Sequence, residues 1–156
     1  MSGFENQPLV GAAPGMVYRY SRLLHWSECD PAGIIFSPNY LRWMVDGVTD
    51  MFLSFGVDPH RMLEGDLRCG LPVLEQQLRY RQAAKLHDRI EHVIEVAKVG
   101  TKSLTFEHRM YRGETCLMEA TDVRVWGVHP IANPGDLRAV PIPDEIRAHL
   151  AARSDR

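Results

Sequence analysis

The 156-residue sequence has little excess charge of either sign and no long apolar run, and each absence excludes a class of protein. It contains 18 lysines and arginines against 20 aspartates and glutamates, so no basic excess points to nucleic acid or to an anionic membrane surface. No apolar stretch approaches the roughly 20 residues that are needed to span a bilayer. We therefore expect a small-molecule or protein partner, with no nucleic acid and no membrane.

Cysteines are also few. Cys29, Cys69 and Cys116 are an odd number and lack the spacing of metal ligands, so reduced thiols in a cytoplasmic protein are the simplest interpretation. The first sixteen residues lack the basic and apolar regions of a signal peptide, and we predict a flexible leader over 1–16. Because 45% of the sequence is hydrophobic, we predict a single domain over 17–156 with its own core. We also predict a cytoplasmic location, and neither a metal nor a cofactor.

The most informative stretch begins with an acidic loop and continues into a long amphipathic segment. Ser37 is a suitable N-cap, Pro38 fits the first helical turn, and Gly56 is a typical C-terminal stop. Between them, apolar residues recur at spacings of three and four, which predicts a helix over 38–55, about 27 Å long. We expect one helix of this length to fill the concave face of a sheet.

The loop before this helix reads Glu28-Cys29-Asp30-Pro31-Ala32-Gly33. It places a carboxylate, Asp30, just ahead of a helix N-terminus, where free backbone N–H groups can bind developing negative charge. A carboxylate paired with such a helix start indicates acyl-transfer chemistry.

From Pro72 onwards the apolar period changes to two, which is typical of strands. A first strand within 16–26 precedes the helix, and a short helix is predicted after Pro143. We interpret 57–71 as an irregular connection with one helical turn around Arg61 to Glu64. The later strands, joined by short turns into an antiparallel meander, are predicted over 72–80, 89–96, 104–110 and 115–128. One long helix on an antiparallel sheet is an α+β domain.

This order of elements and the loop motif together resemble the hot-dog fold, and specifically the 4-hydroxybenzoyl-CoA thioesterase family. The resemblance rests on Asp30-Pro31-Ala32-Gly33-Ile34, then on Pro38-Asn39-Tyr40 and Trp43, with weaker echoes at Lys102-Ser103 and Leu137-Arg138-Ala139. It covers nearly the whole chain, from about residue 17 to residue 150. It implies an antiparallel sheet of about five strands wrapped around one long central helix.

The resemblance also implies an activity. Members of this family hydrolyse acyl-CoA thioesters at the interface of a homodimer, and the dimers often pair into tetramers. The family's catalytic carboxylate corresponds to Asp30, and the backbone N–H that polarises the thioester carbonyl corresponds to that of Ser37. Basic side chains near Lys102 and Arg138 commonly meet the CoA phosphates. We also predict that Gly33, Tyr40 and Val45 bind the substrate, with packing in the core as the alternative for Tyr40.

Two positions depart from the family pattern and bear on the acyl group. A related branch that acts on short aliphatic or carrier-bound acyl groups has a histidine where this chain has Ser37. Members that hydrolyse hydroxybenzoyl-CoA place an aspartate where this chain has Val45. We therefore predict a less polar acyl group, such as an unsubstituted aromatic one.

Several alternatives remain open from the residues alone. Asp30 can act as a nucleophile that forms a mixed anhydride, as a general base for water, or only as a turn-capping side chain. Cys29 with His25 is compatible with thiol chemistry, although an inert cysteine is the simpler interpretation. We interpret His92 and His108, on apolar strand faces, as core or interface residues. The rival function is a non-catalytic acyl-CoA-binding hot-dog dimer. Hydratase chemistry is a third interpretation, but it usually needs a histidine on the loop or helix.

Overall fold

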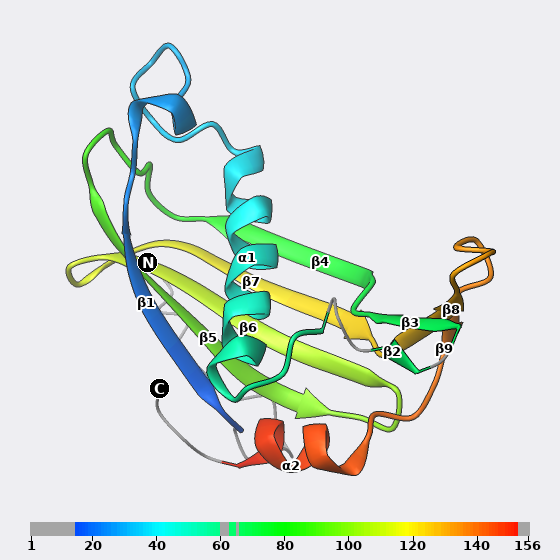
Figure 1. The fold of residues 1–156 in the computed structure, drawn as a ribbon. Helices are drawn as coiled ribbons and strands as arrows, with labels where there is room; N and C mark the ends of the chain where they lie inside the picture. The colour runs from blue at the N-terminus through cyan, green and yellow to red at the C-terminus, as the bar shows by residue number, and fades with distance from the viewer. Residues whose placement is uncertain (1–14, 60–62, 65, 153–156) are drawn as a thin grey trace.

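The computed structural model describes residues 15–59, 63–64 and 66–152 (Figure 1). The predicted leader therefore lies almost entirely outside the described residues. The elements of the described part are β1 (Val17–Leu23), η1 (Trp26–Glu28), α1 (Pro38–Ser54), β2 (Leu63–Glu64), β3 (Leu67–Gly70), β4 (Val73–Tyr80), β5 (Arg89–Val99), β6 (Ser103–Arg112), β7 (Thr115–Val125), β8 (Gly127–Pro130), β9 (Arg138–Ala139) and α2 (Asp144–Ala151).

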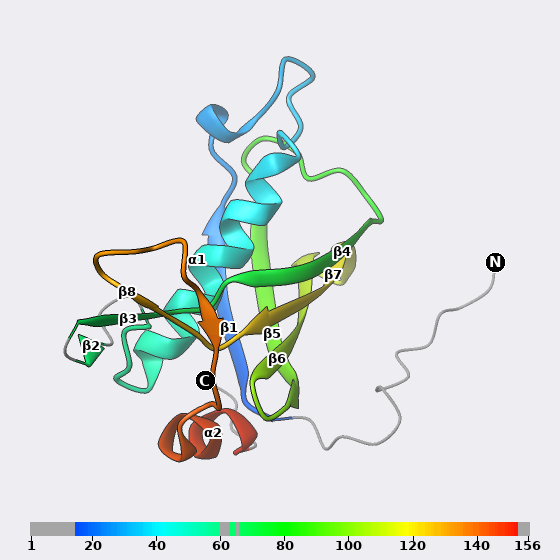
Figure 2. The same ribbon diagram turned by 90° about the vertical axis from the view of Figure 1, so that its right-hand side faces the viewer.

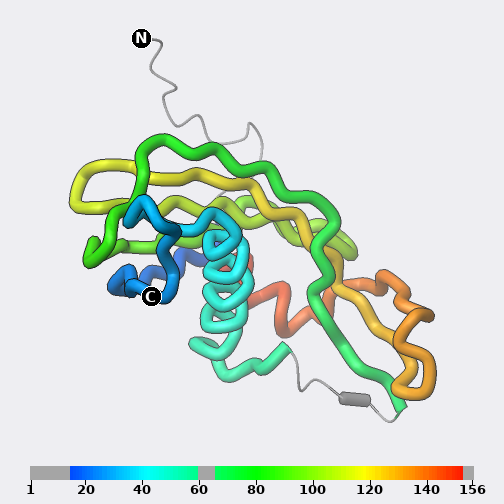
Figure 3. Tube along the Cα trace, turned by 90° about the horizontal axis from the view of Figure 1, so that it is seen from above, coloured from blue at the N-terminus to red at the C-terminus, as the bar shows by residue number. Residues whose placement is uncertain are grey.

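The main sheet has five antiparallel strands in the order β1-β5-β6-β7-β4. The predicted meander is correct for β5, β6 and β7 but wrong for β4. This strand does not pair with β5; residues 81–88 cross the end of the sheet, so that β4 pairs with β7 at the far edge. Figure 3 shows the strands curving along one side of α1, with β4 and β1 at the two edges. The sheet therefore wraps the helix as predicted.

Helix α1 begins and ends close to the predicted limits, but its N-terminus is not capped as predicted. Ser37 already has helical dihedral angles (φ −53°, ψ −33°), and its side chain makes no capping hydrogen bond. The first turn is instead closed by backbone bonds from Asn39 N–H to the Phe36 carbonyl and from Tyr40 N–H to the Ser37 carbonyl. Gly56 ends the helix as predicted, with φ at +83°, a conformation that glycine adopts at little cost.

The core has two apolar clusters that lie against the two halves of α1. Tyr40, Trp43 and Met44 pack into the cluster at the N-terminal half, and Met51 and Phe52 pack into the cluster at the C-terminal half. The buried polar residues of β5, β6 and β7 fall between these clusters in strand register. They form a polar layer in the sheet, which is described below with the candidate site.

The last predicted strand, over 115–128, is wrong as a single element because it is interrupted at Trp126. The Trp126 N–H donates to the Lys102 carbonyl, and its own carbonyl accepts from the Val140 N–H, so the chain leaves the main sheet there. Residues after Trp126 join a smaller sheet in the order β2-β3-β8-β9, which projects to one side of the molecule in Figure 2. The Trp126 side chain itself is buried in the core.

Two further predictions concern the connections. The helical turn predicted over 61–64 is wrong at Leu63 and Glu64, which form β2, while residues 61–62 lie outside the described part of the chain. The C-terminal helix is confirmed as α2, and Ile146 and Leu150 are both buried in the core. Gly15 and Met16, the last residues of the predicted leader, donate backbone hydrogen bonds to Val96 and Leu150.

Candidate active site

Asp30 lies on a tight turn between η1 and α1. Its backbone N–H donates to the Ile34 carbonyl, and its carbonyl accepts from the Gly33 N–H, so both ends of the turn are closed. Gly33 needs a φ of +76°, which other residues rarely adopt. The turn also pairs with the 81–88 crossover, because Leu86 N–H donates to the Gly33 carbonyl and Ile35 N–H donates to the Ala84 carbonyl. The loop is therefore held by backbone bonds on two sides.

The Asp30 carboxylate uses one oxygen in this turn. Oδ1 accepts a hydrogen bond of 2.8 Å from the Ala32 N–H, while Oδ2 has no hydrogen-bond partner among the described residues. The side chain is partly exposed. The turn-capping role that the sequence left open is thus real, and it still leaves one carboxylate oxygen available.

The start of α1 provides a free backbone donor. The N–H groups of Phe36, Asn39 and Tyr40 all donate to backbone carbonyls. Pro38 has no N–H, and the Ser37 N–H donates to no acceptor in the described part of the chain. Ser37 is exposed, so this donor faces the exterior at the positive end of the α1 dipole.

Cys29, next to Asp30, is not organised as a nucleophile. Its thiol contacts the His25 backbone carbonyl, with Sγ 3.5 Å from that oxygen. Partial burial and the neighbouring Asp30 and Glu28 carboxylates raise the pKa of the Cys29 thiol. A thiolate nucleophile needs a lowered pKa, so the geometry favours the interpretation of Cys29 as an inert thiol.

The predicted substrate-binding residues on α1 have very different exposures. Tyr40 is buried, with its ring 5.4 Å from that of Tyr80 and 5.9 Å from that of Trp43. Burial raises the pKa of Tyr40 to about 12, so it remains a neutral phenol. Val45 lies on the opposite face of α1 and is 41% exposed. The structure therefore packs Tyr40 into the core and leaves Val45 on the surface, midway along the helix.

Lys102 and Arg138 lie near each other but far from Asp30. Lys102 precedes β6, and its carbonyl binds the Trp126 N–H; Arg138 is on β9, which pairs with β8 immediately after Trp126. Both side chains are exposed, and Arg138 is paired with Asp136 at 2.8 Å. Figures 1 and 2 show the Asp30 loop at one end of the molecule and these two segments at the other. One copy of the chain does not bring the two sets together.

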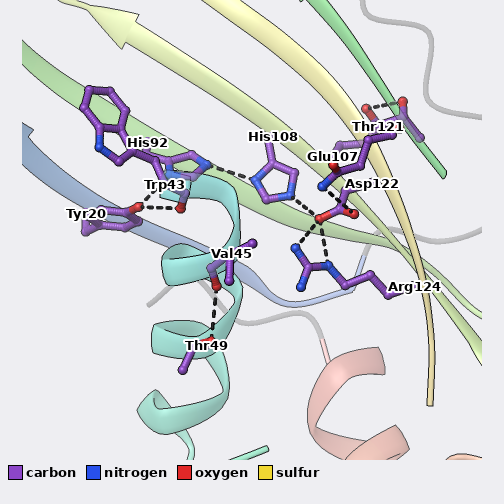
Figure 4. A network of polar contacts seen from close by, with 11 residues as sticks. Tyr20, Trp43, Val45, Thr49, His92, Glu107, His108, Thr121, Asp122 and Arg124 are labelled. Carbon is purple, nitrogen blue, oxygen red and sulfur yellow. Dashed lines mark hydrogen bonds and ion pairs between the residues drawn. The ribbon is translucent and has the colours of Figure 1, made fainter. Parts of the chain in front are cut away.

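The sequence interpretation missed how the interior polar residues connect. A continuous chain of contacts runs across the sheet, as Figure 4 shows. The Tyr20 hydroxyl lies 2.7 Å from His92 Nδ1, and His92 Nε2 lies 2.9 Å from His108 Nδ1. His108 Nε2 then lies 3.3 Å from Asp122 Oδ2, which also accepts 2.8 Å contacts from the Arg124 guanidinium. The sequence carries one signal of these contacts, because the charged residues Asp122 and Arg124 occupy inward-facing positions of the strand predicted over 115–128.

The charge on Asp122 sets the direction of the hydrogen bonds along this series of contacts, from His108 back to Tyr20. Burial would raise the pKa of Asp122, but bonds from His108 and Arg124 lower it overall, so Asp122 is a carboxylate that only accepts. Burial lowers the pKa of His108 and His92, so both imidazoles are neutral and each carries one proton. His108 must therefore carry its proton on Nε2 and His92 on Nε2, and the Tyr20 hydroxyl donates to His92 Nδ1.

No group of metal ligands was found within residues 15–59, 63–64 and 66–152. Across the same residues, no helix is long and apolar enough to cross a membrane.

The sequence and the fold match a known family. The model of the Thioesterase-like superfamily matches residues 24–150, so the chain belongs to this superfamily. The 1,4-dihydroxy-2-naphthoyl-CoA hydrolase of Thermosynechococcus vestitus is 25% identical over 135 residues, which are 84% of this chain and 86% of the relative. The 4-hydroxybenzoyl-CoA thioesterase of Pseudomonas sp. strain CBS-3 is 28% identical over 128 residues, covering 77% and 87% of the two chains.

A solved structure of 4-hydroxybenzoyl-CoA thioesterase from Pseudomonas sp. strain CBS-3 superimposes on this fold with a TM-score of 0.74. The alignment covers 85% of this chain and 98% of the other, at 23% sequence identity. The hot-dog fold predicted from the resemblance is thereby confirmed.

Proposed function

We propose that this protein is an acyl-CoA thioesterase. Asp30 acts as nucleophile or general base, and the Ser37 backbone N–H stabilises the oxyanion. The observation that carries the proposal is the combination of a free Asp30 Oδ2 with a free Ser37 N–H at the start of α1. Both curated relatives described above are named as hydrolases of CoA thioesters, which supports the same reaction.

The chemistry follows from the charge that develops during hydrolysis. When a nucleophile adds to the thioester carbon, negative charge builds on the carbonyl oxygen, and a fixed N–H donor at a helix start stabilises it. Loss of one such donor raises the activation barrier by about 3 kcal/mol. The Asp30 carboxylate either attacks the carbonyl carbon directly, which breaks the C–S bond, releases the CoA thiolate and leaves a mixed anhydride that water hydrolyses, or removes a proton from a water that attacks the carbon. In the second case the tetrahedral adduct breaks its C–S bond and releases the CoA thiolate with the carboxylic acid product.

We propose further that the active unit is a homodimer formed along β4. This strand is an edge of the main sheet, and its Leu74 and Tyr80 side chains are 68% and 55% exposed. None of the exposed large hydrophobic side chains in the described residues lies on β1, the other edge. An edge strand that exposes apolar side chains at both of its ends favours pairing with another strand.

Antiparallel pairing of two β4 strands would also complete the site. The Tyr80 end of β4 contacts Tyr40 at the start of α1, whereas Val73, at the other end, pairs with Arg124 close to the Lys102 segment. Two antiparallel copies would place the Tyr80 end of β4 in one protomer beside the Val73 end of β4 in its partner. Lys102 and Arg138 of that partner could then meet the CoA phosphates while Asp30 meets the thioester. We propose that these dimers pair into tetramers.

Sedimentation velocity tests the dimer. Leu74→Glu combined with Tyr80→Glu is expected to give monomers with no thioesterase activity. Ile131→Glu is the matched control, because Ile131 is also an exposed apolar residue, 47% exposed, but lies beyond β8. A double variant that stays dimeric, or a monomer that keeps full activity, would contradict the β4 interface.

We propose an aromatic or other weakly polar acyl group. Val45 places an apolar side chain on the exposed face of α1, where an aspartate in this position would favour a hydroxylated ring. Free-thiol release from benzoyl-CoA, 4-hydroxybenzoyl-CoA and a short aliphatic acyl-CoA tests activity and preference together. The highest kcat/KM is expected with benzoyl-CoA, and a strong preference for 4-hydroxybenzoyl-CoA would contradict the acyl assignment.

The second candidate function is a non-catalytic acyl-CoA-binding hot-dog dimer. It is favoured by the use of Asp30 Oδ1 in a structural turn, which a pure binding module would also need. Binding of acyl-CoA without thiol release from any substrate in the panel would support it. We also propose a cytoplasmic location, since Cys29 and Cys116 are both free thiols.

A further inference from the structure

We propose that Glu28 is a positioning residue for the thioester hydrolysis proposed above. Glu28 precedes Asp30 by two residues and contacts both the strand before the loop and the helix after it. Its side chain and its backbone carbonyl each have a separate task. Together they fix the Asp30 turn and the Ser37 N–H relative to one another. This inference rests on the proposed function.

The Glu28 carboxylate joins three segments. Oε1 accepts from the Arg22 guanidinium of β1 at 2.7 Å and from the Trp43 indole Nε1 of α1 at 3.2 Å. Oε2 accepts from the His25 backbone N–H at 3.0 Å. The Arg22 guanidinium also lies over the Trp43 ring, 3.9 Å from its centroid, so these side chains form one packed unit.

The Glu28 carbonyl holds the start of α1. It accepts from the Phe36 N–H at 2.9 Å and from the Asn39 side-chain amide at 2.8 Å. Phe36 immediately precedes Ser37 in the chain. The hydrogen bond from the Phe36 N–H therefore fixes the peptide plane next to the one that carries the Ser37 N–H, the proposed oxyanion donor. Glu28 therefore ties the start of α1 to the chain just before segment 30–37, which carries both the carboxylate and the donor.

Glu28 is a charged anchor rather than a second catalytic base. Burial would raise the pKa of Glu28, but the His25 N–H, the Trp43 indole and Arg22 lower it overall, so the group is anionic at neutral pH. Its two oxygens are already occupied by three donors. Charge-assisted bonds of this kind hold geometry firmly, and misplacement of reacting groups by about 1 Å can lower a rate about 100-fold.

The test compares Glu28→Gln with Glu119→Gln. The glutamine keeps the size of the Glu28 side chain but removes its charge and turns one oxygen into a donor, which disfavours the His25 or Trp43 contact. Glu119 is a matched control, because it pairs with Arg81 at 2.8 Å on strand β7, outside the loop. We expect Glu28→Gln to lower kcat about 10- to 100-fold with KM changed less than about threefold, and Glu119→Gln to leave both unchanged.

A folding defect is separated from a positioning defect by a second readout. The Trp43 indole N–H resonance is expected to shift in Glu28→Gln at unchanged far-ultraviolet circular dichroism. If that variant is unfolded at the assay temperature, Trp43→Phe removes a single donor and is expected to lower kcat about three- to tenfold.

The outcomes distinguish this inference from the proposed function. If the wild-type protein hydrolyses a thioester, Asp30→Asn does not, and a folded Glu28→Gln retains kcat within about twofold, only the role of Glu28 is overturned. If Glu28→Gln is unfolded at the assay temperature, a Trp43→Phe variant whose kcat equals that of the wild type overturns the role of Glu28 in the same way. Absence of turnover by the wild-type protein with every substrate contradicts the proposed function itself, and the role of Glu28 with it.

Discussion

His92 Nε2 and His108 Nδ1 lie 2.9 Å apart in the core, and both imidazoles are fully buried. The pair joins strands β5 and β6 at the level where α1 has Gly47 instead of a side chain. It lies between the two apolar clusters and ends at the Asp122–Arg124 ion pair. The sheet therefore holds helix α1 partly through a polar layer, and this layer has measurable consequences.

Stability should fall as the pH is lowered below about 6.5, the ordinary pKa of histidine. Burial lowers the pKa of His92 and His108 in the folded protein, so below that pH the unfolded chain binds more protons than the folded one. Each histidine then removes up to about 1.4 kcal/mol of unfolding free energy per pH unit until its folded-state pKa is reached. Urea unfolding between pH 7.5 and pH 5, with exposed His25→Gln as control, measures the slope; a flat profile would contradict the buried neutral pair.

Asp122→Asn should be strongly destabilising. The substitution keeps the size of the side chain but leaves Arg124, which is only 4% exposed, without its anionic partner. Breaking one partner of a buried ion pair costs about 3–5 kcal/mol. Glu119→Gln, which breaks the more exposed pair with Arg81, should cost less than about 1 kcal/mol in the same urea titration. Equal effects of the two variants would show that the Asp122–Arg124 pair does not hold the sheet.

Gly47→Ala should destabilise the protein although alanine is the better helix former. A Cβ at position 47 would lie 2.6 Å from Ile94 Cδ1, 3.0 Å from the Tyr20 hydroxyl and 3.1 Å from His92 Cε1. Helix propensity alone predicts a gain of about 1 kcal/mol, whereas overpacking costs about 1–3 kcal/mol. The sign of the change in thermal unfolding decides between them, and a raised melting temperature would contradict the close approach of α1 to the sheet.

Two variants of Ser37 separate its hydroxyl from its backbone N–H. Ser37→Ala should leave kcat within about twofold, because the hydroxyl makes no capping bond. Ser37→Pro removes the N–H at a φ of −53°, which proline accepts, and should lower kcat about 100- to 1,000-fold. Steady-state kinetics with benzoyl-CoA checks both. A large loss in Ser37→Ala would instead assign the chemistry to the hydroxyl.

Much of the fold was predictable because its signals are local. The spacing of apolar residues and the stop at Gly56 placed α1, and the alternation of residues such as Ile90 and Leu104 placed β5 and β6 with their inward faces. The position of β4 was not predictable in this way. Strand order depends on which edge a crossover reaches, and the eight residues after Tyr80 carry no signal for that choice.

The candidate site was predictable only where the family motif specifies a residue. The motif pointed to Asp30 and Ser37, and the structure adds that Oδ2 of one and the N–H of the other lack partners among the described residues. The role of Glu28 as an anchor was not predictable, because its partners Arg22 and Trp43 belong to two different elements, β1 and α1, and the pattern of neither element shows how they pack together. The polar layer was missed for the same reason, since its members are on different strands.

Asp30→Asn gives the most direct test of the proposed thioesterase activity. The asparagine amide oxygen can still accept the Ala32 N–H, so the turn is preserved while the carboxylate is lost. Asp46→Asn, an exposed change on α1, is the control. The account predicts that Asp30→Asn keeps the wild-type melting temperature and loses at least about 100-fold in kcat for thiol release from benzoyl-CoA. A folded Asp30→Asn variant with kcat within about threefold of wild type would contradict the account.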